Sequence, residues 1–115
     1  MTTTFDEREQ AFERRFAYEE EARFHTRNRR NRLLATWASE RMGLTGKASE
    51  GYVTAFTEGA VVTRDEDLLA RLHDDLRDAG VEAPLPVLRT EMERCARLAQ
   101  AERRVGLALD QGSSA

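Results

Sequence analysis

The sequence predicts an all-α protein, a four-helix bundle whose first helix is much longer than the other three. Three observations lead to this fold class. Apolar residues recur with the helical period, helix-breaking residues gather at a few points, and no segment alternates as a half-buried strand does. With 115 residues, the chain suits one domain with a modest hydrophobic core.

Helix-breaking residues divide the chain into four predicted helices. Gly43 and Gly46 mark the first break, Gly59 precedes the second, and Gly80 with two following prolines marks the third. The expected helices span residues 4–43, 46–60, 64–79 and 86–109.

Helix-start signals support these boundaries. Thr4 with Glu7, and again Thr63 with Glu66, have the spacing of a capping box, in which the threonine oxygen accepts an otherwise unpaired backbone N–H. Pro86 suits the first turn of a helix, where its missing N–H costs nothing.

The apolar positions that recur on one face of each predicted helix form the expected core. They are Leu34, Trp37, Ala38, Tyr52, Leu72, Leu76, Leu88, Met92 and Leu98. The apolar pattern of the last helix continues through Val105 and Leu109. Cys95 lies on the same helix among apolar residues, and we interpret it as a small core residue.

The first helix has an interrupted apolar face. Phe5, Phe12 and Phe16 fall within an arc of about 40° at roughly 100° per residue, and Leu34 and Trp37 return to about the same direction. The residues in that direction between them are charged: Glu19, Glu20, Arg23, Arg27 and Arg30. A core cannot run continuously beneath this helix, because unpaired buried charges cost several kcal/mol.

The interruption predicts a division of the chain into three parts. Residues 1–20 are expected to project as a mobile, partly disordered arm, residues 21–110 to form the bundle, and residues 111–115 to form a disordered tail. Periodicity alone leaves one alternative open, in which the arm folds back and its phenylalanines join the core.

No set of residues indicates catalysis or a bound cofactor. His25 and His73 lie at expected surface positions, and the single cysteine cannot join a zinc cluster. The Gly-Lys pair of "TGKAS" lacks the upstream glycine of a phosphate-binding loop. We therefore expect neither an enzyme nor a cofactor, and weak adenine-nucleotide binding has no phosphate-binding motif to support it.

The charge distribution leaves two classes of partner. The formal net charge is only −3, and Lys47 is the only lysine, so almost every basic residue is an arginine suited to paired contacts. The segment "RFHTRNRRNR" permits an alternative function as a small helical arginine-rich nucleic-acid-binding or adaptor protein. Helical pairs such as Glu19–Arg23 favour a solvated helix instead.

The absence of an apolar run or an N-terminal signal pattern, together with the lone cysteine, predicts a cytoplasmic protein without membrane insertion.

Long stretches of the chain are similar to a known family. The segments "FDEREQAFERRFAYEEEARF", "RRNRLLATWASERMGLTG" and "DEDLLARLHDDLRDAGV" resemble the zeta subunit, the natural ATPase inhibitor of alphaproteobacterial F-type ATP synthases. The resemblance implies a four-helix bundle whose N-terminal segment enters the catalytic head and stops rotation in the hydrolytic direction.

The resemblance also implies a partner and a set of contact residues. The partner would be the catalytic head of F-type ATP synthase, with its catalytic, non-catalytic and shaft subunits. The protein would be a monomer when free. Bound to that enzyme, it would lie at the inner face of the cell membrane. The implied inhibitory segment runs from Thr2 to Glu20. Its apolar anchors would be Phe5, Phe12 and Phe16, and its charged contacts would be Asp6, Arg8, Glu9, Glu13, Arg14 and Arg15.

Overall fold

A computed structural model of the chain describes residues 3–113 and contains four α-helices and no strand within that range. The helices are α1 (Thr3–Arg41), α2 (Gly46–Ala60), α3 (Asp65–Asp78) and α4 (Leu85–Ser113). This result confirms the predicted all-α class and the number of helices, and the boundaries differ from the expected ones by a few residues.

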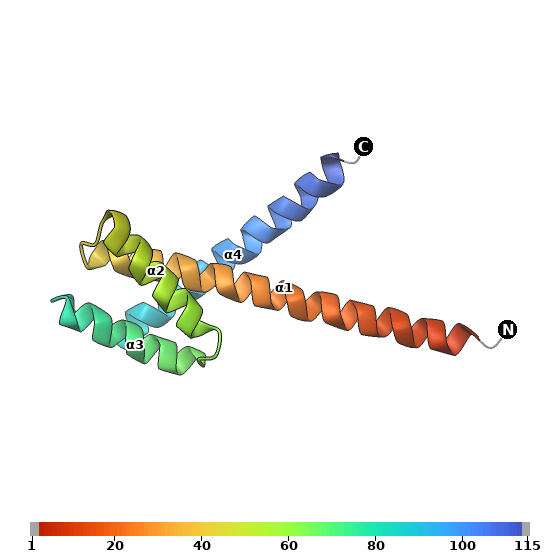
Figure 1. Cartoon of the computed structure of the whole chain (residues 1–115), viewed down its shortest axis with the longest axis horizontal. Helices are drawn as coiled ribbons and strands as arrows, with labels where there is room; N and C mark the ends of the chain where they lie inside the picture. The colour runs from red at the N-terminus through yellow and green to blue at the C-terminus, as the bar shows by residue number, and fades with distance from the viewer. Residues whose placement is uncertain (1–2, 114–115) are drawn as a thin grey trace.

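Helix α1 gives the molecule its elongated shape, with extents of 68 × 33 × 25 Å (Figure 1). The C-terminal half of α1 packs mainly on α2 and α4 and only slightly on α3, while α3 packs on α4. The N-terminal half extends beyond the other helices, and the C-terminal part of α4 diverges from it (Figure 1). The predicted long first helix is therefore confirmed.

The core lies where the four helices meet. Six predicted core residues are buried: Leu34, Ala38, Leu72, Leu76, Leu88 and Met92. Phe56 of α2 is the largest fully buried side chain, and Cys95 is fully buried, as predicted from its place on an apolar face. Burial of these apolar side chains, at about 1.5–3 kcal/mol each for the larger ones, supplies the main favourable term in folding.

Three predicted core positions differ from the expectation. Trp37 and Tyr52 are only partly buried and pack against the edge of the core. Leu98 is 39% exposed, so its assignment to the core was wrong. At roughly 100° per residue, Leu98 lies about 60–100° away from Cys95 and Ala99, which face the core.

The apolar pattern at the end of α4 also lacks a covering element. Val105 and Leu109 are exposed, because α4 has by then diverged from α1 (Figure 1). The tail expected to be disordered over residues 111–115 is helical through Ser113, and residues 114–115 lie outside the described range. A single glycine costs a helix only about 1 kcal/mol, so Gly112 does not end α4.

The helix ends show which boundary signals were correct. Gly43 and Gly80 both have positive φ angles and follow α1 and α3 as C-terminal caps. After α3, the Val81 N–H donates to the Leu76 carbonyl at 2.8 Å and the Gly80 N–H to the Arg77 carbonyl at 2.9 Å, which is a Schellman motif.

The capping box at Thr63 was wrong. The Thr63 hydroxyl donates backward to the Gly59 carbonyl at 2.7 Å, and α3 begins after Arg64, which makes no side-chain cap. A threonine hydroxyl can bond either way along the chain, and the preceding turn of α2 offers a free carbonyl. The start of α1 expected from the capping box at Thr4 differs by one residue from the observed start at Thr3.

Candidate functional site

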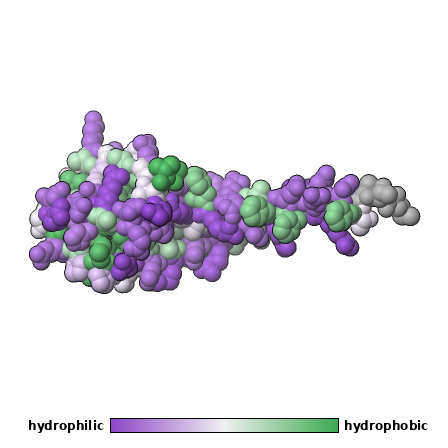
Figure 2. Space-filling model, turned by 90° about the horizontal axis from the view of Figure 1, so that it is seen from below, coloured by the Kyte–Doolittle hydropathy of each residue, from purple (hydrophilic) through white to green (hydrophobic). Residues whose placement is uncertain are grey.

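The arm, defined as residues 3–21 of α1, extends beyond the other helices and has no tertiary cover from Thr4 onward (Figure 1). Every residue from Thr4 to Glu21 is exposed, and Ala22 is the first that is not. Phe5, Phe12 and Phe16 are 75%, 71% and 57% exposed. Figure 2 shows the arm as a narrow, mainly hydrophilic rod that carries separate hydrophobic spots. The arm therefore does not fold back onto the core, which was the alternative left open by periodicity.

The arm is a continuation of the bundle helix rather than a separate element. All of its residues from Thr3 onward are helical, so the expected partial disorder stays a prediction. Starting a helix is the costly step, and here the buried half of α1 supplies the first turns. The arm therefore needs only propagation, which Ala, Arg and Glu favour.

Most charged groups on the arm have no partner among the side chains that the structure describes. Within residues 4–110, none of the following makes an ion pair or a side-chain hydrogen bond: Asp6, Arg8, Glu9, Glu13 and Arg15. Arg14 donates from Nε to the carbonyl of Gln10 at 3.3 Å. The structure thus presents three apolar rings and several unpaired charges of both signs on one exposed helix. These side chains belong to the segment that the family resemblance implies to be inhibitory.

The segment just after the arm is stabilised by local pairs. Arg23 contacts Glu19 at 3.9 Å and also pairs with Glu20, one turn earlier in the helix. The predicted Glu19–Arg23 pair is therefore confirmed. Exposed pairs of this kind contribute only about 0.3–0.5 kcal/mol, so they support the helix without fixing its direction.

Arg27 and Arg30, the last two charged residues of the interrupted face, bind the bundle, which corrects part of the argument drawn from that face. Arg30 is bound to Asp65 at the start of α3, through NH1 to Oδ2 at 3.0 Å and NH2 to Oδ1 at 2.8 Å. Arg27 donates to the same carboxylate at 3.1 Å and to the carbonyls of Ala60 and Thr63 at 2.9 and 2.6 Å. The bundle covers these charges because it offers them a carboxylate and free carbonyls.

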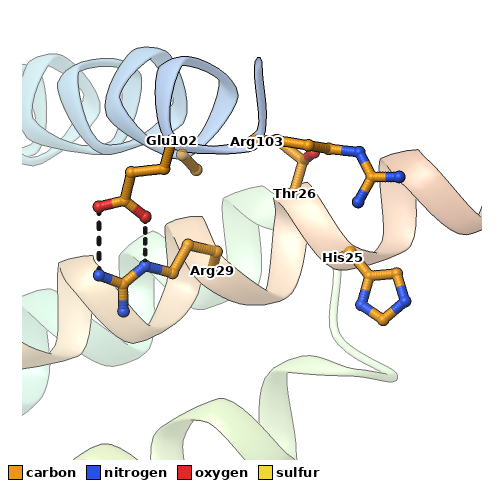
Figure 3. Close-up of a pocket in the computed structure, with 6 residues that line it drawn as sticks. His25, Thr26, Arg29, Glu102 and Arg103 are labelled. Carbon is orange, nitrogen blue, oxygen red and sulfur yellow. Dashed lines mark hydrogen bonds and ion pairs between the residues drawn. The ribbon is translucent and has the colours of Figure 1, made fainter. Parts of the chain in front are cut away.

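The opposite side of the same turn is bound to α4. Arg29 and Glu102 form a two-pronged pair, with Nε to Oε2 at 2.7 Å and NH2 to Oε1 at 3.2 Å (Figure 3). This pairing raises the pKa of Arg29 and lowers the pKa of Glu102 through the hydrogen bond. Likewise, the hydrogen bond from Arg30, followed by that from Arg27, holds the pKa of Asp65 below its ordinary value.

Sequence reasoning missed these long-range pairs. The sequence analysis singled out neither Asp65 nor Glu102 as a partner of these arginines. Two features of the sequence could have indicated these pairs. Three of residues 27–30 are arginines, and the predicted third helix begins with a cluster of acidic residues. Four of the five arginines in that segment, Arg23, Arg27, Arg29 and Arg30, pair with acidic groups of the chain, so the alternative of nucleic-acid binding loses most of the groups on which it rested.

The remaining chemistry of the described residues is sparse. His25 and His73 are not buried, as expected. An open hollow of about 250 Å³ lies between α1 and α4, but its Arg29 and Glu102 are already paired with each other (Figure 3). No group of three potential metal-binding side chains occurs in the part of the chain that the structure describes. None of the described helices is long and apolar enough to cross a membrane.

Comparison with known families identifies the chain. The family model described as ATPase inhibitor subunit zeta matches residues 1–102. The chain belongs to this family. The match covers α1, α2, α3 and α4 as far as Glu102, and leaves out residues 103–115. Searches of curated proteins and of solved structures find no match.

Proposed function

We propose that this zeta-family protein inhibits ATP hydrolysis by F-type ATP synthase and that its N-terminal arm is the inhibitory element. The observation that carries this proposal is the exposure of Phe5, Phe12 and Phe16 on a helix that the bundle leaves uncovered. Family membership supplies the activity, and the arm supplies the surface through which a small protein without a catalytic constellation can act.

The contact residues are exposed side chains of the arm. The rings of Phe5, Phe12 and Phe16 enter an apolar cleft of the catalytic head, and the charged groups of the arm contact its walls. These groups are Asp6, Arg8, Glu9, Glu13, Arg14 and Arg15. Charges of both signs in one segment favour a single register of binding, because a shifted helix places like charges together.

The energetics require both kinds of contact. Three buried phenyl rings contribute about 4–9 kcal/mol of gross apolar stabilisation. Fixing one residue of a free chain costs about 1–2 kcal/mol, so ordering a fully disordered arm would consume that gain. An arm that is helical before it binds loses less entropy, and charge-assisted hydrogen bonds from its arginines add about 1.5–3 kcal/mol each.

The mechanism is steric. A catalytic interface that must open and close during hydrolysis is blocked when a helix lies in it, without any contact with the reacting groups. The arm inserts between catalytic and non-catalytic subunits near the rotating shaft and stops rotation in the hydrolytic direction, while rotation in the synthetic direction ejects it. The protein is then a peripheral component of the inner face of the cell membrane, attached through ATP synthase.

A pair of variants tests the role of the arm. One lacks residues 1–20, and the other carries Phe5→Ala, Phe12→Ala and Phe16→Ala. Both should lose inhibition of ATP hydrolysis by the purified enzyme, because the apolar anchors are gone. Both should keep the thermal transition of the parent, because the bundle does not contact these side chains.

The matched control is the triple change at exposed apolar positions outside the arm, Val62→Ala, Val87→Ala and Val105→Ala. This variant should inhibit as the parent does. Inhibition by the truncated protein at the parental concentration would show that the arm is not the inhibitory element.

A further inference from the structure

One turn of α1 is held from two sides at the point where the arm leaves the bundle. We define the collar as Arg27, Arg29 and Arg30 of α1 with Asp65 of α3 and Glu102 of α4. Asp65 binds Arg27 and Arg30, and Glu102 binds Arg29. At roughly 100° per residue, Arg29 lies about 160° from Arg27 around the helix, so the two acidic groups hold opposite sides of it.

The collar is the last polar attachment before the arm. Among residues 4–110, whose side chains the structure describes, no α1 residue that precedes Arg27 makes an ion pair or a side-chain hydrogen bond with another helix. Helix α1 also has little packing contact with α3, so Asp65 supplies the main connection between them. An open hollow of about 400 Å³ borders Asp65, Arg27 and Arg30, so the side chains are not closely packed around these ion pairs.

The collar is rigid because its central arginine is fixed on both sides. The side chain of Arg30 is only 11% exposed. Besides binding Asp65, it donates from Nε and NH2 to the Asn31 Oδ1 at 3.0 and 2.8 Å, and Asn31 is fully buried. A guanidinium with two planar sets of contacts has little freedom to rotate, so Arg30 ties this turn of α1 to Asp65 at the start of α3.

A small change of angle at the collar has a large effect at the tip of the arm. From Arg27 to Phe5 the helix extends roughly 33 Å, so a tilt of about 10° moves Phe5 by roughly 6 Å. That displacement is about the width of a phenyl ring, which is enough to carry the ring out of a fitted site. Correct insertion of all three rings therefore depends on the direction in which α1 leaves the bundle.

We propose that the collar is a positioning device that fixes the direction of the arm, with Asp65 as its principal positioning residue and Glu102 as the second. This inference rests on the proposed function, because a fixed direction matters only if the arm enters a partner. Neither acidic residue contacts the partner in this mechanism. Each restricts the orientations of the arm before binding, and so raises the fraction of molecules that can insert.

The first test measures the direction of the arm in the free protein. Spin labels at Gln10→Cys and Glu58→Cys, in a Cys95→Ala background, report the distance from the arm to α2. Asp65→Asn should broaden the distance distribution, and Asp65→Asn with Glu102→Gln should broaden it further. Asp67→Asn is the matched control, because it removes a carboxylate from the same first turn of α3 that contacts only Arg64 on the surface.

The second test measures inhibition of ATP hydrolysis by the same variants without labels. If the arm keeps its binding direction for a third to a tenth of the time, the half-inhibitory concentration rises by about three- to tenfold. The double variant should show the largest rise and Asp67→Asn none. Residual dipolar couplings of the unlabelled proteins repeat the direction measurement without the three cysteine changes.

The outcomes separate this inference from the proposed function. An unchanged distance distribution in the double variant overturns the collar, even if the arm deletion abolishes inhibition. A broadened distribution with unchanged inhibition overturns the positioning role. Persistent inhibition after removal of residues 1–20 instead overturns the proposed function, and does not alter the distance result. A loss of inhibition that follows a lowered melting temperature, with an unchanged distribution, also overturns the inference.

Discussion

The two halves of helix α1 have similar chemistry and opposite surroundings. The first half, residues 4–21, carries three phenylalanines that are all exposed, while the second half, from Thr26, contributes fully buried Leu34 and Ala38 to the core. Both halves are rich in arginine. In the first half the arginines make no long-range ion pair with described residues, whereas Arg27, Arg29 and Arg30 bind carboxylates from other helices.

The difference shows that apolar residues at helical spacing do not by themselves define a core. A phenylalanine is buried only where another element covers it, and helices α2 and α4 pack on the C-terminal half of α1 (Figure 1). The uncovered face is then available to a partner. An exposed apolar surface on an otherwise charged helix is a common mark of a protein–protein contact.

The largest expected effect compares one phenylalanine from each region. Phe56→Ala should lower the free energy of unfolding by about 3–5 kcal/mol, because this fully buried ring leaves a cavity in the core. Phe12→Ala should change it by less than about 0.5 kcal/mol, because this ring has no tertiary cover. Urea denaturation followed by circular dichroism measures both. Equal losses would mean that the arm packs on the bundle in solution.

A smaller effect distinguishes tertiary from local polar contacts. The Tyr52 hydroxyl donates to the Asp75 Oδ2 at 2.9 Å, and partial burial, followed by this hydrogen bond, raises the pKa of Tyr52. Tyr52→Phe should cost about 0.5–1.5 kcal/mol of unfolding free energy, because it removes the donor to a partly buried carboxylate.

The matched change on α1 is Glu20→Gln, which alters an exposed pair with Arg23. It should leave the urea midpoint unchanged within error. A midpoint shift as large as that of Tyr52→Phe would show that the local pairs contribute more than their exposure indicates.

The smallest expected effect concerns the pH dependence of the collar. The pKa of Asp65 is lowered in the folded protein, so its ion pairs stabilise the fold above the ordinary carboxyl pKa of 3.8, and this contribution is lost as the pH falls through the depressed value. Asp65→Asn removes this acid-dependent contribution. Because the side chain is 48% exposed, the contribution should be below about 1 kcal/mol.

Urea midpoints of the parent and Asp65→Asn, measured between pH 5 and 2, test this expectation. The two midpoints should converge as the pH decreases. Parallel curves would show that Asp65 titrates as a free carboxyl group, which would weaken the case for a rigid collar.

The candidate site divides into a part that local pattern could predict and a part that it could not. The arm was predictable because the direction of Phe5, Phe12 and Phe16 continues into charged residues, a feature visible from helical spacing alone. The collar was not predictable, since Asp65 lies 35 residues beyond Arg30 and Glu102 lies 73 residues beyond Arg29. A pair so distant in sequence depends on how the intervening helices turn, which local pattern does not encode.

The sequence by itself determined the four helices, most of the core and the family, because period, breaking residues and motif order are local properties of the chain. The tertiary structure alone decided which apolar residues are covered and which charges are paired. Leu98 is exposed because it points away from the core-facing direction of Cys95 and Ala99 around the axis of α4. Arg27 and Arg30 are paired because α3 begins beside them with Asp65. Burial and ion pairing depend on the distance between helices, and that distance exists only once the chain has folded.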